Sequence, residues 1–373
     1  MSIYTVQWAV TGRCNFRCRH CFVGEVHEEL PLSDLIRLCD RLKEAGVPRV
    51  SLTGGEPLTR KDLPALAEAL AARGISITQI ATNGSLLTED FLRELIRIGH
   101  RPRISISYDG DEGWHDRLRG RTGAAESALR AFDLCGKAGL STASEMTLHS
   151  GNLPVLRRSL ATLAAHGCEE VKALPLMAVG RGRTEPSCPG PPEPEPLFES
   201  FMDAVAGYYA GEYPLRLSLY GFFSAGPDQE GWSVPMARIP EDGDGRSLCE
   251  HAAFIPYLAA DGRLLPCTGL AGFTGLAEEF PSLLETSLAE AMASEPYRAF
   301  LDYTRKKHQS ANKTCADCKA RKACGGGCRL NALCRGDGFS GCDPWCCAFF
   351  LDGWHEKIPG AIRRGKLEKM LRE

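Results

Sequence analysis

The sequence has no long apolar run and no excess of charge of either sign. No uninterrupted apolar stretch approaches the roughly 20 residues that span a bilayer. The first residues, Met1-Ser2-Ile3-Tyr4, lack the basic segment and apolar core of a secretory signal. With 44 basic and 47 acidic residues, the chain offers no strong field for nucleic acid or an anionic membrane. We therefore expect a cytoplasmic protein that binds neither nucleic acid nor a membrane.

Cysteine, in contrast, is abundant. The 373 residues include 17 cysteines, and ten of these lie between Cys249 and Cys347. Because disulfides are rare in cytosolic proteins, this number points to metal binding. The length is sufficient for one large α/β domain and a smaller module.

Short β-branched runs alternate with amphipathic stretches from residue 4 to about residue 177. Six such units predict an α/β fold with a parallel sheet and helical crossovers. Periodicity alone leaves a curved barrel and a doubly wound sheet both open. The candidate strands are 5–10, 49–53, 75–81, 103–107, 142–147 and 171–176, and the candidate helices are 33–45, 62–73, 88–98, 124–138 and 153–166.

Three closely spaced cysteines follow the first candidate strand. Cys14, Cys18 and Cys21 form a C-x3-C-x2-C run with His20 before the last cysteine. Three thiolates can hold three irons of a 4Fe-4S cluster and leave the fourth iron open to a small molecule. A structural zinc site is the alternative, but it usually needs four ligands in C-x2-C pairs.

These cysteines resemble the signature of the radical S-adenosylmethionine superfamily, with His20 in its aromatic position. The resemblance implies a partial (β/α)6 TIM-like barrel over residues 1–177, S-adenosylmethionine as cofactor, and its reductive cleavage to a 5'-deoxyadenosyl radical. A Gly-Gly-Glu-Pro motif after the second strand supports it. The residues that the resemblance assigns to S-adenosylmethionine are His20, Gly54, Gly55, Glu56, Pro57, Asn83, Ser107, Asp109 and Arg119. Of these, Arg119 is a lone arginine in a charged loop, and such a residue is more often a solvated surface residue.

A second cysteine pattern begins at Cys249. Its spacing, C-x12-G-x4-C followed by C-x2-C-x5-C-x3-C and a last cysteine, resembles the SPASM domain of many radical S-adenosylmethionine enzymes. The resemblance implies two auxiliary iron-sulfur clusters, whereas one or two zinc sites remain the alternative. By position, one cluster would use Cys249, Cys267 and Cys328, and the other Cys315, Cys318, Cys324 and Cys346.

The sequence departs from related SPASM domains at two positions. Some relatives have an additional cysteine before the first one here, where this chain has residues 241–244, Glu-Asp-Gly-Asp. The first auxiliary cluster would then have an open iron, or take a carboxylate, Cys342 or Cys347 as its fourth ligand. Sulfatase-maturing relatives have an Asp after the second module cysteine, where this chain has Thr268.

The remaining segments complete four expected regions. A Pro- and Gly-rich linker with a bridging helix and strand covers 178–248, between the partial barrel and a SPASM domain at 249–350. A basic amphipathic helix covers 351–373, and the simplest expectation is that it packs on the SPASM module.

The resemblance implies a maturase of a ribosomally made peptide or protein that forms a thioether or carbon-carbon crosslink. A flavodoxin- or ferredoxin-type protein would supply electrons, and a separate peptide-recognition protein could bring the substrate. Three alternatives stay open: a sulfatase-maturase-type dehydrogenase, a peptide epimerase, and an enzyme whose carboxyl-terminal module is a zinc-stabilised binding domain. An epimerase needs a thiol that returns hydrogen, for which Cys334, Cys342 and Cys347 are the candidates.

Overall fold

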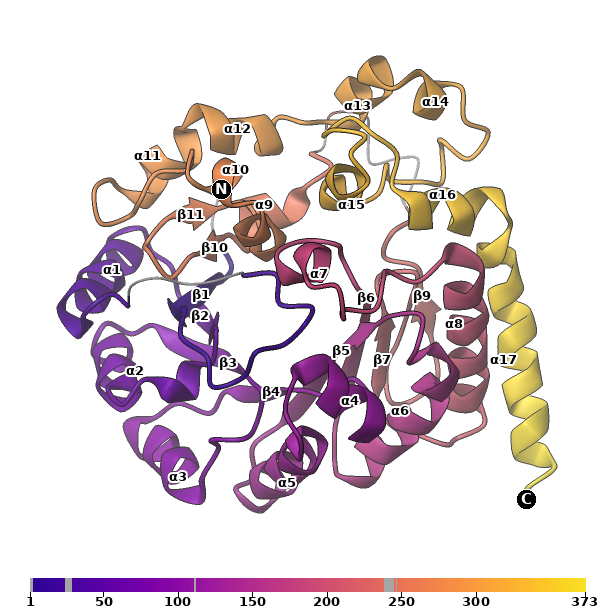
Figure 1. Ribbon diagram of the computed structural model, residues 1–373, viewed down its shortest axis with the longest axis horizontal. Coiled ribbons are helices and arrows are strands. Elements are labelled where there is room, and N and C mark those ends of the chain that lie inside the picture. The colour runs from indigo at the N-terminus through magenta and orange to yellow at the C-terminus, as the bar shows by residue number, and fades with distance from the viewer. Residues whose placement is uncertain (1–2, 24–28, 111, 238–244, 246) are drawn as a thin grey trace.

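The computed structural model describes residues 3–23, 29–110, 112–237, 245 and 247–373 (Figure 1). Its centre is a run of six neighbouring parallel strands, which confirms the expected α/β fold. The strands are β1 (Val6–Thr11), β2 (Arg49–Gly54), β3 (Ser76–Thr82), β4 (Arg103–Ser107), β5 (Thr142–Leu148) and β6 (Glu170–Pro175). The helices around them are α1 (Leu32–Glu44), α2 (Leu63–Ala72), α3 (Glu89–Ile98), α4 (Glu112–Arg119), α5 (Ala124–Lys137) and α6 (Leu156–Ala165).

Local sequence explains where these elements begin and end. Helix α3 starts at Thr88, whose hydroxyl accepts a hydrogen bond from the Phe91 backbone N–H, and it ends at Gly99 with φ of 104°. In β1, the side chains of Val6, Trp8 and Val10 are all buried. Such alternating apolar side chains fix the strand register because a shift by one residue would expose them.

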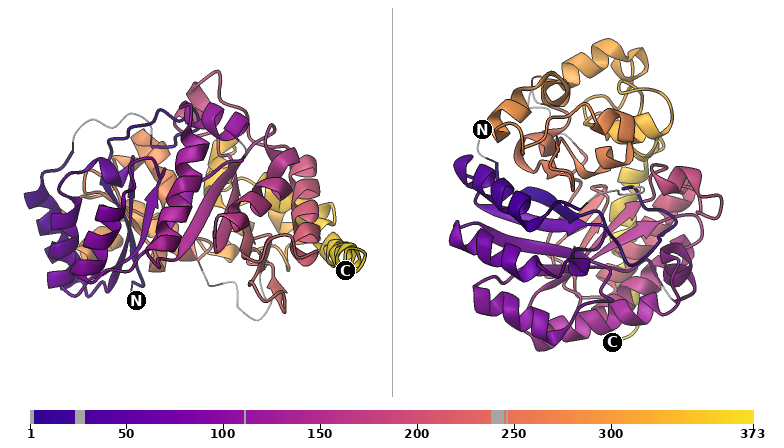
Figure 2. Two further views of the ribbon diagram at one scale, coloured as in Figure 1. Left: turned by 90° about the horizontal axis from the view of Figure 1, so that it is seen from below. Right: turned by 60° about the vertical axis from the view of Figure 1, so that its left-hand side comes forward.

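The sheet continues beyond the barrel strands on both sides. After β6 it adds the parallel β7 (Arg216–Leu219) and the antiparallel β8 (Phe223–Ala225) and β9 (Trp232–Ser233). On the other side, β10 (Tyr257–Leu258) pairs in parallel with β1, and β11 (Leu264–Leu265) pairs with β10. The cysteine-rich module is therefore joined to the barrel by backbone hydrogen bonds, and Figures 1 and 2 show it at the side of the barrel, between α1 and α8. The antiparallel β10 and β11 form a hairpin that turns at Asp261-Gly262.

The carboxyl-terminal helix α17 (Trp354–Met370) is present, but it does not pack mainly on the cysteine-rich module. It lies along α8 (Pro194–Tyr209), the helix of the linker (Figure 1). Gly365 lets the two backbones approach, because a Cβ there would overlap the Ala206 carbonyl oxygen. No helix in the described ranges is long and apolar enough to cross a membrane.

Several connections between elements come from short helices. The linker contributes α7 (Arg181–Thr184). The module contains α9 (Glu250–Phe254), α10 (Thr274–Ala277), α11 (Leu288–Ala293), α12 (Glu295–Leu301), α13 (Arg305–Ala311), α14 (Lys313–Ala316), α15 (Arg329–Cys334) and α16 (Pro344–Leu351).

Candidate active site

The first three cysteines lie on the loop that follows β1, at the carboxyl edge of the sheet. The glycine motif after β2 holds this loop through backbone hydrogen bonds, Gly55 N–H to Thr11 O at 2.8 Å and Glu56 N–H to Arg13 O at 2.8 Å. Gly54 has φ of 146°, and a Cβ on it would overlap the Thr11 carbonyl oxygen. The glycines therefore permit a close approach to the cysteine loop, in addition to lining the cavity described below.

The Glu56 carboxylate joins β2 to β3. Its oxygens accept hydrogen bonds from the Thr82 hydroxyl at 2.8 Å and from the Asn83 backbone N–H at 2.7 Å. Burial raises its pKa. Glu56 and Pro57 lie behind the cavity wall rather than on it. Glu56 thus holds the ends of β2 and β3 together behind the cavity.

The carboxylate of Asp109 is fully buried and engaged by protein groups. The Arg119 guanidinium donates to it, with an Nε–Oδ2 distance of 2.6 Å, and the Thr147 backbone N–H donates at 2.8 Å. Burial alone would raise the pKa of Asp109, but Arg119 and His115 outweigh it and hold that pKa well below the usual range. Arg119 is not a solvated surface residue: its side chain is 12% exposed, and Nη1 lies 4.0 Å from the Cys18 Sγ.

Three other predicted residues face the cavity directly, namely His20, Asn83 and Ser107. Burial lowers the pKa of His20 to about 3, so its imidazole is neutral, and its buried Nδ1 has no hydrogen-bond partner among the described residues. The Asn83 amide donates to the Asn15 side-chain oxygen at 2.9 Å. The sequence patterns did not single out Asn15, which lies between Cys14 and Cys18.

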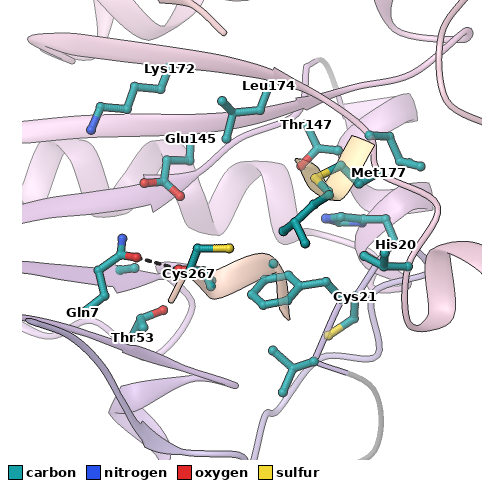
Figure 3. A pocket seen from close by; sticks show the side chains of 18 of the residues that line it. Gln7, His20, Cys21, Thr53, Glu145, Thr147, Lys172, Leu174, Met177 and Cys267 are labelled. Carbon is teal, nitrogen blue, oxygen red and sulfur yellow. Dashed lines mark hydrogen bonds between the residues drawn. The ribbon is translucent and has the colours of Figure 1, made fainter. Parts of the chain in front are cut away.

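One large cavity, of about 1300 Å³, connects the two parts of the molecule. On the barrel side it is lined by Cys14, Cys18 and Cys21, and on the module side by Cys249, Cys267 and Cys328. Figure 3 shows Glu145 and Lys172, from β5 and β6, beside the space that Cys267 and His20 also border. The structure thus places the N-terminal thiols and the first auxiliary set on a shared space.

The second auxiliary set lines a separate, much smaller cavity. Cys315, Cys318, Cys324 and Cys346 border it together with Cys347. Cys342 lies here as well, with its Sγ 3.6 Å from the Sγ of Cys315.

These positions bear on the fourth ligand of the first set and on the epimerase thiol. Cys342 and Cys347 lie beside the second set rather than the first. Cys334, Cys342 and Cys347 all lie outside the lining of the large cavity. Residues 241–244 lie outside the described part of the chain. Each of the three proposed thiol donors is therefore away from the space where a substrate would meet the N-terminal cysteines.

The donor sets fit the cofactors that the sequence implied. Three thiols on one loop, facing a large cavity, suit a 4Fe-4S cluster with one open iron. The glycine-bounded wall and the unpartnered His20 Nδ1 suit a polar ligand such as S-adenosylmethionine. In the described ranges, no three His, Cys, Asp or Glu side chains converge to hold a single metal ion. Burial raises the pKa of Cys14 to about 11 and of Cys267 to about 12, so their deprotonation must accompany iron binding.

Comparisons with known proteins agree with both cysteine patterns. Residues 8–154 match the model of the radical SAM superfamily, and residues 249–319 match that of an iron-sulfur cluster-binding domain, SPASM. The chain is 30% identical to GTP 3',8-cyclase of Rhodopseudomonas palustris over 315 residues, 77% of this chain and 84% of that one. It is 26% identical to PqqA peptide cyclase of Granulibacter bethesdensis over 345 residues, 90% and 85% of the two chains.

A third relative matches over a shorter stretch. Fe-coproporphyrin III synthase of Methanosarcina barkeri is 34% identical over 152 residues, 40% of this chain, and the match spans only 38% of that protein.

Solved structures share the fold. SuiB of Streptococcus suis bound to precursor peptide SuiA superposes with a TM-score of 0.69 at 17% identity, covering 93% of this chain and 76% of SuiB. The structure of native anSMEcpe with bound AdoMet and the Cp18Cys peptide gives a TM-score of 0.73 at 15% identity and covers 98% of this chain and 99% of that one. The chain therefore belongs to the radical SAM superfamily and carries a SPASM domain, and it is an enzyme that uses S-adenosylmethionine, a 4Fe-4S cluster and auxiliary iron-sulfur clusters.

Proposed function

We propose that this enzyme is a maturase of a ribosomally made peptide or protein and forms a thioether or carbon-carbon crosslink. The observation that carries the proposal is the shared cavity, which is bordered by the N-terminal cysteines and by the first auxiliary set. Bound there, S-adenosylmethionine supplies a radical that removes hydrogen from an unreactive carbon. A carbon held between the two cysteine sets can lose its hydrogen on one side and an electron on the other.

Named relatives support a peptide substrate. The cavity of about 1300 Å³ has to hold S-adenosylmethionine as well as the substrate, so these relatives, rather than its size, indicate the substrate class. Relatives whose names identify a peptide substrate are PqqA peptide cyclase and the peptide-bound SuiB and anSMEcpe. We further propose a flavodoxin- or ferredoxin-type electron donor and, where the substrate needs it, a separate recognition protein.

Crosslinking also needs a group that accepts a proton from the substrate. The hydroxyl of Thr268, at the position where sulfatase-maturing relatives have an Asp, donates to the Gln7 side-chain oxygen at 2.5 Å and is not a base. The Glu145 carboxylate lines the cavity on β5 and forms no hydrogen bond or ion pair with another described residue. We assign the proton acceptor to Glu145.

The three alternatives are less well supported by these positions. A sulfatase-maturase-type dehydrogenase would lack its base, because Thr268 stands at the position of the Asp. A peptide epimerase would need a thiol in the cavity other than Cys334, Cys342 and Cys347. A purely zinc-stabilised module would leave the first auxiliary set, which borders the cavity, without a redox role.

The test is anaerobic co-expression of the enzyme with each short open reading frame that flanks its gene, followed by mass spectrometry of the peptide products. A crosslinked peptide is lighter by the mass of two hydrogen atoms. The segment between the two crosslinked residues also resists fragmentation in the mass spectrometer. Epimerisation would leave the mass unchanged. Purified enzyme is also incubated with S-adenosylmethionine, reductant and GTP, the substrate in the name of one relative. GTP-dependent formation of 5'-deoxyadenosine, with no peptide present, would contradict the proposal.

A further inference from the structure

The side chain of Arg329, which directly follows the cysteine ligand Cys328, is buried at 1% exposure. Its guanidinium donates to carbonyl oxygens, those of Phe339 at 3.0 Å and Gly341 at 2.8 Å, and also to that of Gly326. These acceptors are neutral. Arg329 forms no salt bridge with an Asp or Glu of the described residues.

A buried positive charge without a partner is costly, so the molecule must supply negative charge nearby. The carboxylate of Asp343 is already occupied, because it accepts hydrogen bonds from the backbone N–H groups of Cys328 and Cys346 and from the Asn331 amide. The charge of Arg329 acts on this carboxylate at a distance, and it also acts on the thiols of Cys315 and Cys324, two members of the second auxiliary set. An iron-sulfur cluster with four thiolates is an anion, and it would add negative charge beside the buried guanidinium.

Arg329 also touches a buried histidine of α13. Its Nη1 lies 3.4 Å from the Nδ1 of His308, which is 1% exposed. A guanidinium can only donate, so this contact favours the tautomer in which Nδ1 is unprotonated and the ring proton lies on Nε2. Burial lowers the pKa of His308 to about 4, which keeps the ring neutral.

The Nε2 atom of His308 is the second independent observation. It is buried and has no hydrogen-bond partner among the described residues. Yet His308 lines the small cavity that Cys315, Cys318, Cys324 and Cys346 also line. A buried N–H donor without an acceptor is rare in proteins, and a sulfur of the cluster would be that acceptor.

We propose that Arg329 and His308 form an outer-sphere support of the second auxiliary cluster: Arg329 supplies its buried countercharge and orients His308, whose Nε2–H donates to a cluster sulfur. Positive charge and N–H donors stabilise the reduced, more negative state of a cluster more than its oxidised state. The pair therefore raises the reduction potential of this cluster. This holds whatever the substrate is, so its failure would leave the proposed function untouched.

The test is an anaerobic redox titration of the reconstituted holoenzyme, followed by electron paramagnetic resonance. The N-terminal cluster is identified by the change of its signal on addition of S-adenosylmethionine, and the second auxiliary cluster by its loss in Cys318→Ala. His308→Phe removes the donor while keeping a ring, and His308→Gln keeps an N–H near the same place. We expect a more negative potential for the second auxiliary cluster alone in His308→Phe, and a potential near wild type in His308→Gln.

Charge and tautomer are separated by further variants. Arg329→Met should lower the same potential more than His308→Phe does, because it removes both the charge and the group that orients the ring. Lys307→Met removes an exposed charge from the same helix and should leave the potential unchanged. Tyr303→Phe removes the hydroxyl that lies 3.2 Å from Nδ1 of His308 and should have little effect on the potential.

Unchanged potentials in His308→Phe with full iron content would overturn the proposal, as would equal shifts of both auxiliary clusters. If Arg329→Met loses the cluster, the two His308 variants decide the question.

Discussion

Arg119 and Asp109 form a buried ion pair directly behind the N-terminal cysteine loop, with the guanidinium Nε 2.6 Å from the carboxylate Oδ2. Asp109 is fully buried, and Arg119 also approaches Cys18. Asp109 was expected to bind the cofactor, but in the structure its carboxylate holds Arg119, whose Nη1 lies 4.0 Å from the Cys18 Sγ.

Replacing Asp109 by Asn should destabilise the protein by about 3–5 kcal/mol, because it leaves the buried Arg119 charge without its partner. The measurement is urea unfolding of the cluster-free protein followed by circular dichroism. Glu94→Gln removes an exposed carboxylate 2.6 Å from Arg97, and because water screens that pair it should change the free energy of unfolding far less. A similar small effect for both variants would contradict a buried pair.

The same pair predicts how stability depends on pH. The pKa of Asp109 is lower in the folded protein than in the unfolded chain, so its ionised form stabilises the fold above the unfolded value of about 4. That contribution is lost as the pH falls through the folded-state value. The free energy of unfolding of wild-type protein should therefore fall more steeply than that of Asp109→Asn as the pH drops below about 4. Parallel curves would show that Asp109 has an ordinary pKa.

Gly54→Ala should displace the cysteine loop, since the added Cβ would overlap the Thr11 carbonyl oxygen and a φ of 146° is unfavourable for alanine. We expect iron per chain to fall from about twelve to about eight, the loss of one 4Fe-4S cluster. Iron, sulfide and zinc analysis after anaerobic purification measures this. Gly136→Ala, where nothing lies within 4 Å of the added Cβ, is the control and should keep full iron. Zinc in place of the auxiliary iron would favour the binding-module alternative.

Cys342 and Cys318 should differ although both thiols belong to the second auxiliary region. Cys318 is an expected cluster ligand, so Cys318→Ala should remove about four irons. Cys342 is an additional thiol beside Cys315, and Cys342→Ala should leave the iron content unchanged. Loss of the first auxiliary cluster in Cys342→Ala would show that this cysteine reaches across to complete it.

Glu145→Gln should slow peptide modification by about 10²-fold or more, the usual contribution of a positioned base. Cleavage of S-adenosylmethionine without substrate should stay near wild type, because Glu145 lies on β5 facing the cavity rather than among the N-terminal thiols. Chromatography of 5'-deoxyadenosine and mass spectrometry of the peptide separate the two steps. Glu89→Gln, on the exposed start of α3, is the matched control. Equal loss of both steps would make Glu145 a structural residue.

The sequence by itself determined the cofactor class and the order of strands and helices. Thiols spaced for a cluster lie close along the chain, and alternating or helical apolar patterns are local, so both can be read without the fold. The same holds for the Gly54-Gly55 motif, although only the structure shows that it braces the cysteine loop as well.

Only the tertiary structure decided which thiols share a space. Cys267 and Cys21 are far apart in sequence but border one cavity because β10 pairs with β1, whereas Cys342 and Cys347 were assigned to the second set by the fold of the module. Burial was equally invisible in the sequence. Arg119 and Arg329 occur in polar segments of the chain, yet packing removes both from water, and it is the loss of solvation that makes their partners matter.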